Sequence, residues 1–316
     1  MSPMTDVYES RADRNAAIIL RQDPVVYPAA NATPASGLSP AEIECYKRDG
    51  FVFLKGLFSA RETAILSREV ENMLRDPAIS GSQEAIREPG SDAVRSVFKV
   101  HKLNAMLSRL ARDMRLVNIA RQILGSEVYI HQSRANIKPG FVGKEFYWHS
   151  DFETWHIEDG MPSMRALSCS VLLTDNNECN GPLMLIPGSH KHFISCVGET
   201  PDNHYLQSLK KQEYGVPDSD SLRFLVERGG INTMNGPAGS VVFFDCNTMH
   251  GSNSNISPYP RSNVFMVYNS VENALGSPKF GLSPRPEFIA TREDWSAIKS
   301  VEPGYLRTVG KEVAGA

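Results

Sequence analysis

The sequence predicts a mainly β fold, an antiparallel barrel or jelly roll that follows a helical first part. Short β-rich segments recur from Glu127 onward, separated by Gly, Pro and Asn, as in folds built from many short antiparallel strands. Before Glu127, apolar residues recur mostly at helical spacing. A chain of 316 residues is long for one domain but within reach of a β fold with helical additions.

Residues 1 to 39 form a predicted N-terminal extension. Its segment DVYESRADRNAAIILRQ has the composition of a short helix, whereas VVYPAANATPASGLSP is rich in Pro, Ala and Ser and is typical of a tether. Ser39 then opens a helix as its N-cap, with Pro40 at the first position and Glu42 completing a capping box. This helix is expected to end near Arg48, before Asp-Gly.

Residues 40 to 125 are the predicted helical entry of a single domain that spans 40 to 290. FVFLKGLF indicates a short strand, and SARETAILSREVENMLRD indicates an amphipathic helix capped by Ser59. The stretch from Pro77 to Asp92 is charged and rich in Gly and Ser, which favours a loop. MLSRLARDMRLVNIARQIL has the apolar spacing of one helix.

Residues 126 to 275 are the predicted jelly-roll core. The expected strands are VYIHQSRANIK, RALSCSVLLT, PLMLIP, SVVFFD and NVFMVYNS. The polar stretch from Ser195 to Asp220 lacks a strand pattern and is a candidate mobile cover. Residues 291 to 316 form a C-terminal extension, and RPEFIATREDWSAIK is expected to be partly helical.

Composition excludes several classes of protein. With 41% hydrophobic and 22% charged residues, the chain can bury a core, and a net charge of −3 gives no footprint for nucleic acid or a membrane surface. The five cysteines are scattered and odd in number, which argues against a disulfide framework or a thiolate zinc site and favours reduced thiols in the cytoplasm. No signal peptide or membrane-spanning run is expected.

The sequence contains a candidate set of metal-ligating residues, which are His149, Asp151 and the distant His250. Residues i and i+2 of a strand share a face, so His149 and Asp151 are expected to point the same way. His250 follows the run SVVFFD, a strand that can lie beside the first in a barrel. Two imidazoles and one carboxylate leave three octahedral positions open, which suits non-haem Fe(II) that handles O2.

Ser252 and Arg261 add weight to this interpretation. A 2-oxoglutarate cosubstrate chelates iron through its keto acid, and its far carboxylate needs a fixed, charged partner. Arg261 offers a planar guanidinium fork and Ser252 a hydroxyl donor. Each feature alone has a plainer explanation, since His-x-Asp is common in solvated turns and an arginine at a strand end is commonly a surface charge.

A long segment joins the metal motif to the following strands and reads FYWHSDFETWHIEDGMPSMRALSCSVLLTDNNECNGPLMLIPGSH. It resembles the signature segment of the ectoine hydroxylases, members of the phytanoyl-CoA dioxygenase group of Fe(II)/2-oxoglutarate oxygenases. SPAEIECYKRDGFVFLKGLFS, REPGSDAVRSVFKVH and FFDCNTMHGSNSN with RSNVFMVYNSVEN match as well, so the resemblance covers most of residues 40 to 275. The His-x-Asp, His and Arg skeleton identifies only the superfamily, whereas the DFETWH-x-EDG type of segment is far more specific.

The resemblance implies a double-stranded β-helix with flanking α-helices. It also implies hydroxylation of ectoine to 5-hydroxyectoine, with O2 and 2-oxoglutarate consumed and succinate and CO2 released. The family works in the bacterial cytoplasm, commonly as a homodimer, during osmotic or heat stress. The implied iron ligands are His149, Asp151 and His250, and the implied 2-oxoglutarate contacts are Arg261, Ser252, Asn136 and Phe146.

Ectoine is a small cyclic amidinium that bears a carboxylate, and aromatic faces hold such a delocalised cation with about 0.5–2 kcal/mol each. The family positions that line the substrate pocket match Trp155, Phe244 and Phe265, with Gln132 and Ser168 as polar contacts and Phe98 as a further wall. Core packing is the plainer explanation for Phe244 or Phe265 alone. Trp155 stands in a polar stretch without apolar neighbours, which fits a core position poorly.

The charged residues that follow the metal motif need a separate explanation. Glu153, Glu158 and Asp159 are expected to fix a loop through His156, Arg165 or backbone amides, because a fourth carboxylate on iron would occupy positions that O2 and the cosubstrate need.

Three alternatives stay open at this point. The first is the same chemistry on another small substrate or an acyl-CoA, although an acyl-CoA would want a basic surface and a long apolar groove. The second is a non-catalytic jelly-roll module that binds a small molecule, which would not need Arg261 beside a complete triad. A metal-assisted hydrolase is weaker, because no general base is paired with a substrate-polarising group.

Overall fold

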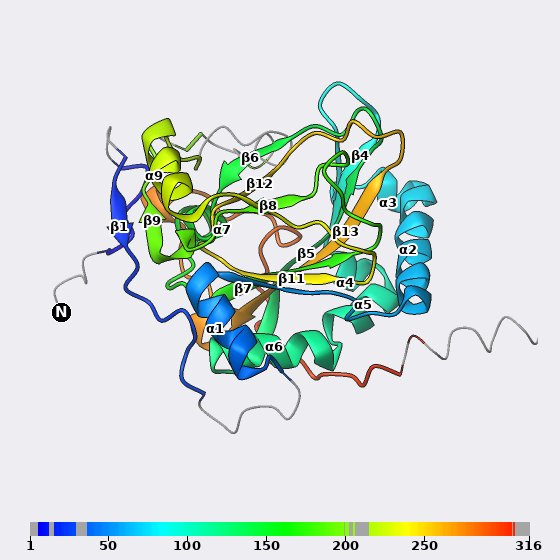
Figure 1. The fold of residues 1–316 in the computed structure, drawn as a ribbon, viewed down its shortest axis with the longest axis horizontal. Coiled ribbons are helices and arrows are strands. Elements are labelled where there is room, and N and C mark those ends of the chain that lie inside the picture. Colours follow the sequence, from blue (N-terminus) through cyan, green and yellow to red (C-terminus); the bar gives the residue numbers. More distant parts are fainter. Residues whose placement is uncertain are drawn as a thin grey trace, which may run out of the picture.

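The computed structural model describes residues 6–12, 16–29, 37–198, 200–201, 205, 215–304 and 306 of the 316. Its centre is a seven-stranded antiparallel sheet with the order β2-β11-β7-β13-β5-β4-β3 (Figure 1). The strands are β2 (Phe51–Leu54), β3 (Ala85–Arg87), β4 (Val94–Phe98), β5 (Val128–Lys138), β7 (Ala166–Leu172), β11 (Val241–Asp245) and β13 (Arg261–Ser270).

A smaller antiparallel sheet has the order β10-β8-β12-β6. Its strands are β6 (Phe146–His149), β8 (Leu183–Leu185), β10 (Asn232–Thr233) and β12 (His250–Ser252). Leu183 and Leu185 of this sheet share one buried apolar cluster with Leu172, Val242 and Phe244 of the larger sheet. The two sheets therefore pack face to face, as the predicted jelly roll requires.

Strand β11 shows how the alternation of side chains builds two layers of core. Val242 and Phe244 point into the cluster between the sheets, whereas Val241 and Phe243 belong to the main core cluster. That main cluster also contains Leu66 of α2, so helices cover the opposite face of the large sheet. Because successive residues of a strand face opposite sides, one uniformly apolar strand serves both layers.

The helices of the covering layer come mainly from the entry segment (Figure 1). They are α1 (Pro40–Asp49), α2 (Ala60–Arg75), α3 (Pro77–Ser80), α4 (Val100–Leu103), α5 (Ala105–Ala111) and α6 (Met114–Leu124). The predicted N-caps Ser39 of α1 and Ser59 of α2 are present, and each forms a capping box with the glutamate three residues later, a box that was predicted only at Ser39. None of the described helices is long and apolar enough to cross a membrane.

The remaining elements lie around the smaller sheet and along the N-terminal segment. Strand β1 (Ile18–Leu20) pairs with β9 (His192–Ile194) in a separate two-stranded sheet. The other elements are α7 (Asp151–Asp159), α9 (Ser219–Gly229) and the 3-10 helices η1 (Ser189–Lys191), η2 (Val271–Asn273) and η3 (Lys279–Gly281).

Several local predictions are wrong, and most concern irregular backbone. Where it is described, the segment DVYESRADRNAAIILRQ contains β1 instead of a helix, because Ile18–Leu20 find a partner strand. The single helix predicted over MLSRLARDMRLVNIARQIL is divided, since Asp113 caps a new helix with its side chain. The predicted loop from Pro77 contains α3 and β3, and the C-terminal RPEFIATREDWSAIK contains no helix.

Some predictions lie partly or wholly outside the described residues. Residues 30–36 of the predicted tether and much of the polar stretch between Ser195 and Asp220 belong to this group. The boundaries at residues 39, 125, 275 and 290 stay predictions.

Candidate active site

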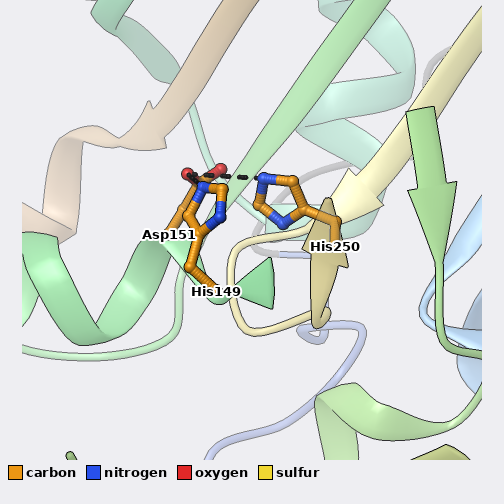
Figure 2. A group of neighbouring side chains, drawn as sticks. All are labelled: His149, Asp151 and His250. Carbon is orange, nitrogen blue, oxygen red and sulfur yellow. Dashed lines mark ion pairs between the residues drawn. The ribbon is translucent and has the colours of Figure 1, made fainter. Parts of the chain in front are cut away.

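His149, Asp151 and His250 lie together, with one possible ligand atom from each within 4.8 Å of the others (Figure 2). His149 ends β6 and pairs directly with His250, which begins β12, so the two rings lie 4.2 Å apart between centroids. The Nε2 atom of each imidazole lies 3.8 Å from Oδ1 of Asp151. Three ligand atoms therefore face one point from one side.

The other ring nitrogens are held by backbone carbonyls. Nδ1 of His149 lies 2.8 Å from the carbonyl oxygen of Tyr147, and Nδ1 of His250 lies 2.9 Å from that of Thr248. A carbonyl only accepts, so each Nδ1 carries the proton and each Nε2 presents a lone pair. Ser168 donates to Oδ2 of Asp151 at 3.0 Å, which leaves Oδ1 facing the imidazoles.

Electrostatics keep the triad in the protonation state of metal ligands. Burial, followed by the charge of His250, lowers the pKa of His149 to about 3, and burial also lowers the pKa of His250. Burial opposes ionisation of Asp151, but the neighbouring imidazoles and Arg134 outweigh it and lower the pKa of its carboxyl. At neutral pH two neutral imidazoles face one carboxylate, a donor set that fits a divalent cation with open positions.

The route by which the sequence brings His149 and Asp151 together differs from the prediction. The prediction placed both residues on one strand, two positions apart and on the same face. Asp151 is instead the first residue of helix α7, so strand alternation does not explain why the two side chains meet. The expectation for the following carboxylates is also wrong. Glu153, Glu158 and Asp159 lie in α7, and arginines at positions 11 and 285 pair with them, whereas Arg165 pairs with Glu272.

A cavity opens beside His149 and His250. Arg261, at the start of β13, lines it and donates to the carbonyl of Gly181 at 2.9 Å and to Oδ1 of Asn136 at 3.3 Å. Its buried Nε has no hydrogen-bond partner, and within the described part of the chain no carboxylate pairs with it. A buried guanidinium without a counter-ion is a receptor for an anionic ligand.

Ser252, Asn136 and Phe146 line the same cavity. The ring of Phe146 packs against His149 with 4.9 Å between centroids. The structure therefore gathers the four residues predicted as cosubstrate contacts, Arg261, Ser252, Asn136 and Phe146, next to the triad.

Three cationic residues of this cavity were not predicted from the sequence, and one of them, Arg95, pairs with Glu88. Lys138, at the end of β5, donates to Oγ of Ser252 at 2.7 Å and to the carbonyl of Asn253. Arg134 lies over the rings of Phe98 and Phe265, at 6.0 Å and 4.9 Å from their centroids, and its Nε has no hydrogen-bond partner in the part of the chain that the structure describes. Both alternate with Asn136 along the strand VYIHQSRANIK. This spacing places all three side chains on one face of the strand, so it could have predicted that Arg134 and Lys138 line the same cavity as Asn136.

The predicted substrate contacts divide into two groups. Phe265 and Phe98 line the cavity, and Phe244 lies 5.0 Å from His250 between ring centroids. Gln132 instead donates to the carbonyl of Ile289 at 2.8 Å, and Ser168 hydrogen-bonds to Asp151.

Trp155 lies in an apolar cluster together with Tyr8, Phe152 and Met161, and it contacts His131 edge-on at 5.0 Å. The expectation that Trp155 lacks apolar neighbours is therefore wrong, because Phe152 and Met161 lie close to it in the sequence and Tyr8 comes from a distant part of the chain. Its role as a substrate contact stays a prediction.

The fold and the site together define a class of enzyme. A double-stranded β-helix that holds two histidines and one carboxylate at one point, beside a cavity with an unpaired arginine, is the arrangement of a non-haem Fe(II)/2-oxoglutarate dioxygenase. Comparison with known proteins agrees with this class. The model of the phytanoyl-CoA dioxygenase family matches residues 46–263.

Relatives of known name place the chain more narrowly. It is 70% identical over 302 residues to the ectoine dioxygenase of Bordetella bronchiseptica, which covers 96% of this chain and 97% of that protein. It is 56% identical over 303 residues to the ectoine dioxygenase of Stutzerimonas stutzeri, which covers 95% and 99%. The chain belongs to the phytanoyl-CoA dioxygenase family and, within it, to the ectoine dioxygenases.

Solved structures agree with the fold. The crystal structure of EctD from S. alaskensis with 2-oxoglutarate and 5-hydroxyectoine superimposes with a TM-score of 0.84 at 47% identity, covering 94% of this chain and 98% of that one. The same enzyme with bound Fe gives a TM-score of 0.83 at 46% identity and the same coverage.

Proposed function

We propose that this enzyme hydroxylates ectoine to 5-hydroxyectoine. One atom of O2 enters the C–H bond of ectoine and the other enters succinate, while 2-oxoglutarate loses CO2. The observation that carries this proposal is the cavity itself, where a triad suited to Fe(II) adjoins three phenylalanine rings and two arginines that have no carboxylate partner among the described residues. Relatives named ectoine dioxygenase over nearly the whole chain support the choice of substrate.

In this proposal His149, Asp151 and His250 hold Fe(II), which supplies O2 activation and the oxidative decarboxylation of the cosubstrate when bound. Arg261 and Ser252 fix the far carboxylate of 2-oxoglutarate. Asn136 orients the guanidinium of Arg261, to which its Oδ1 is hydrogen-bonded, and Phe146 closes the side of the pocket. Lys138, which already bonds Ser252, adds a third donor for the same carboxylate.

The substrate side uses the remaining cation and the aromatic residues. Arg134 faces the carboxylate of ectoine, because it is the cation of the cavity nearest to Phe265 and lacks an acidic partner among the described residues. The aromatic faces hold the amidinium and exclude water from the reacting C–H bond. The proposed substrate contacts are Gln132, Trp155, Ser168, Phe244 and Phe265.

We also propose a cellular setting and an assembly. The enzyme works in the cytoplasm and forms a homodimer. Each subunit has a single dioxygenase domain over residues 40–290. The product is a compatible solute that the cell makes under osmotic or heat stress. The family resemblance supports these statements. Analytical ultracentrifugation of the purified protein tests the dimer, for which a single species at the monomer mass is the contrary result.

The central experiment incubates the purified protein anaerobically with Fe(II), 2-oxoglutarate and ectoine and then admits O2. Mass analysis is expected to show a product 16 Da heavier than ectoine, with one succinate per product. A panel of amino acids and an acyl-CoA serves as the control. Succinate release stimulated by a panel member but not by ectoine would refute the proposed substrate, and no release with any of them would refute the proposed chemistry.

A further inference from the structure

The described part of the N-terminal extension, residues 6–12 and 16–29, is called the N-terminal strap here. It is anchored by β1, whose three residues pair with β9, and by Tyr8, whose ring packs against Phe152 and Phe193. The strap brings two buried arginines, Arg11 and Arg21, to the two segments that carry the candidate metal ligands.

Arg11 is bound to helix α7 directly behind Asp151. Its Nε and Nη2 donate to the two carboxylate oxygens of Glu153 at 2.9 and 2.7 Å, and Nη1 donates to Glu158 at 2.7 Å. The side chains of Arg11 and Glu153 are each only 1% exposed. Arg11 also has a φ of 60°, a left-handed conformation that costs roughly 1–3 kcal/mol in a non-glycine residue and persists where its surroundings impose it.

Arg21 is bound to the turn that leads from β11 to His250. Its Nη1 donates to Oδ1 of Asp245 at 2.8 Å, with both side chains at most 3% exposed. The same oxygen accepts the backbone N–H of Asn247 at 2.8 Å, and the carbonyl of Asp245 accepts the N–H of Thr248 at 2.9 Å. Arg21 therefore holds the carboxylate that shapes the turn, and the carbonyl of Thr248 in that turn orients His250.

The two anchored segments also contact each other. The backbone N–H of Phe152 donates to the carbonyl of Cys246 at 2.8 Å, which joins the first turn of α7 to the turn after β11. Ser150, the N-cap of α7, makes no side-chain cap hydrogen bond. The first turn of α7 is thus held by Cys246 and by the pair of Arg11 with Glu153 in place of a normal cap.

We propose that the N-terminal strap is a positioning element of the metal centre, in which Arg11 fixes Asp151 through Glu153 and Arg21 fixes His250 through Asp245. This inference rests on the proposed function. Buried ion pairs add little net stability, because desolvation offsets their attraction, but a bidentate arginine fixes orientation. A metal site needs its ligands held to within roughly 0.5 Å, and outer partners of metal ligands affect metal affinity.

The test measures Fe(II) affinity by anaerobic titration, together with the visible spectrum of the Co(II) form as a signature of ligand geometry. The variants R11K and R21K both keep the charge. R11K loses the two-pronged contact with Glu153, and R21K loses the planar guanidinium that binds Asp245 and neighbouring backbone carbonyls at the same time. Each is expected to raise the dissociation constant for Fe(II) about 10-fold or more and to change the Co(II) spectrum. Each is also expected to release more succinate than hydroxylated product, because the reacting centre is misplaced.

The matched control is R115K. Arg115 forms a partly buried double pair with Glu62 and Asp113 among the entry helices, so its loss tests the effect of a lost double pair away from the candidate metal ligands. R115K is expected to bind Fe(II) within twofold of the wild type. The double variant R11K/E153Q tests whether Arg11 acts through Glu153. If it does, the dissociation constant for Fe(II) rises in the double variant by no more than in R11K alone, instead of by the sum of the two single effects on the binding free energy.

The outcomes distinguish the positioning role of the N-terminal strap from the proposed function of the enzyme. Wild-type affinity and spectrum in folded R11K and R21K would overturn the positioning role, and if either fails to fold, E153Q or D245N replaces it with the same expectation. A wild-type protein that binds neither Fe(II) nor Co(II) would overturn the proposed function itself.

Discussion

At the scale of single residues, the imbalance of charge in the cavity is the feature with most consequence. Arg95 is paired with Glu88 at 3.0 Å, but Arg134, Lys138 and Arg261 have no carboxylate within ion-pair distance among the described residues. Such unpaired cations are costly to bury. Their cost is offset when anions bind. In the proposed arrangement the far carboxylate of 2-oxoglutarate pairs with Arg261 and Lys138, and the carboxylate of ectoine pairs with Arg134.

Replacing Arg261 tests this match at one position. R261M removes the guanidinium but keeps the apolar stem, and a lost charge-assisted hydrogen bond is worth about 1.5–3 kcal/mol. The KM for 2-oxoglutarate is therefore expected to rise roughly 10- to 150-fold, while the KM for ectoine changes little. Initial rates of succinate formation measure both constants. Equal increases in the two KM values would show that Arg261 supports the whole cavity instead of the cosubstrate.

Lys138 makes cosubstrate binding depend on pH. Burial, followed by the charges of Arg261 and Arg95, lowers its pKa to about 6, while Glu88 and Glu145 oppose this effect. Above pH 6 the free site holds mainly the neutral amine, and an arriving dianion favours the ammonium form, so binding takes up a proton. The affinity for 2-oxoglutarate is therefore expected to fall as the pH rises above 6, by at most about tenfold per unit.

The measurement for Lys138 is the dissociation constant of 2-oxoglutarate at pH 6, 7 and 8 by anaerobic titration of the Fe(II) form. K138M is the matched variant, because it keeps the length of the side chain and cannot titrate. It is expected to bind more weakly at pH 6 and to show a flatter dependence. The same slope in K138M and the wild type would assign the proton to another group.

At the scale of elements, the sequence predicts what local patterns determine. The strand VYIHQSRANIK is predicted with its observed bounds, and the N-caps Ser39 and Ser59 are predicted from their positions before helical patterns. Helix α7 was missed, because nearly all its residues are buried and its charges have no helical pattern in the sequence. The partner of Glu153 lies 142 residues away, and no local pattern contains such a contact.

The ligand set of the candidate site was foreseeable for a different reason. His149 and His250 could be paired from the order of strands in a barrel, and resemblance supplied the choice of these residues. Lys138 and Arg134 were not foreseeable as unpaired cations, because whether a charge has a partner depends on tertiary contacts.

The end of helix α1 supports the turn before His250, and a glycine makes this possible. Gly50 has a φ of 84°, and its carbonyl accepts the hydroxyl of Thr248 at 3.0 Å and the N–H of Asp245 at 2.8 Å. A Cβ at this position would collide with Nδ1 of His190 and Oγ1 of Thr248. G50A is therefore expected to destabilise the fold by more than the roughly 1–2 kcal/mol of a left-handed alanine and to weaken Fe(II) binding.

Gly56 provides the matched control for this prediction. It has a φ of 66°, and nothing lies within 4 Å of the position of its Cβ. G56A therefore carries the backbone cost without the collision. Urea unfolding and anaerobic Fe(II) titration compare the two variants. A G50A protein no less stable than G56A, with unchanged Fe(II) affinity, would contradict the role given to this helix end.

At the scale of the whole molecule, the candidate active site joins parts of the chain that are far apart in sequence. The strap reaches α7 through Arg11, and the C-terminal part reaches the same helix through Arg285, which binds Asp159. The candidate metal ligands belong to a strand end, a helix start and another strand start. Occupancy of the site by Fe(II) and 2-oxoglutarate should therefore stabilise the assembled fold and not only one loop.

This coupling predicts a ligand-dependent shift in thermal unfolding. A ligand that binds only the folded state at 100 times its dissociation constant adds about 2.7 kcal/mol to the free energy of unfolding, so Fe(II) with 2-oxoglutarate should raise the Tm of the wild type by several degrees. D151A removes one ligand atom and is expected to lose both this shift and hydroxylation, whereas D220A, which changes an exposed carboxylate of α9, should keep both. Anaerobic differential scanning calorimetry measures the shift. An equal shift in D151A would mean that Asp151 contributes nothing to the binding of the metal and would contradict its assignment as a ligand.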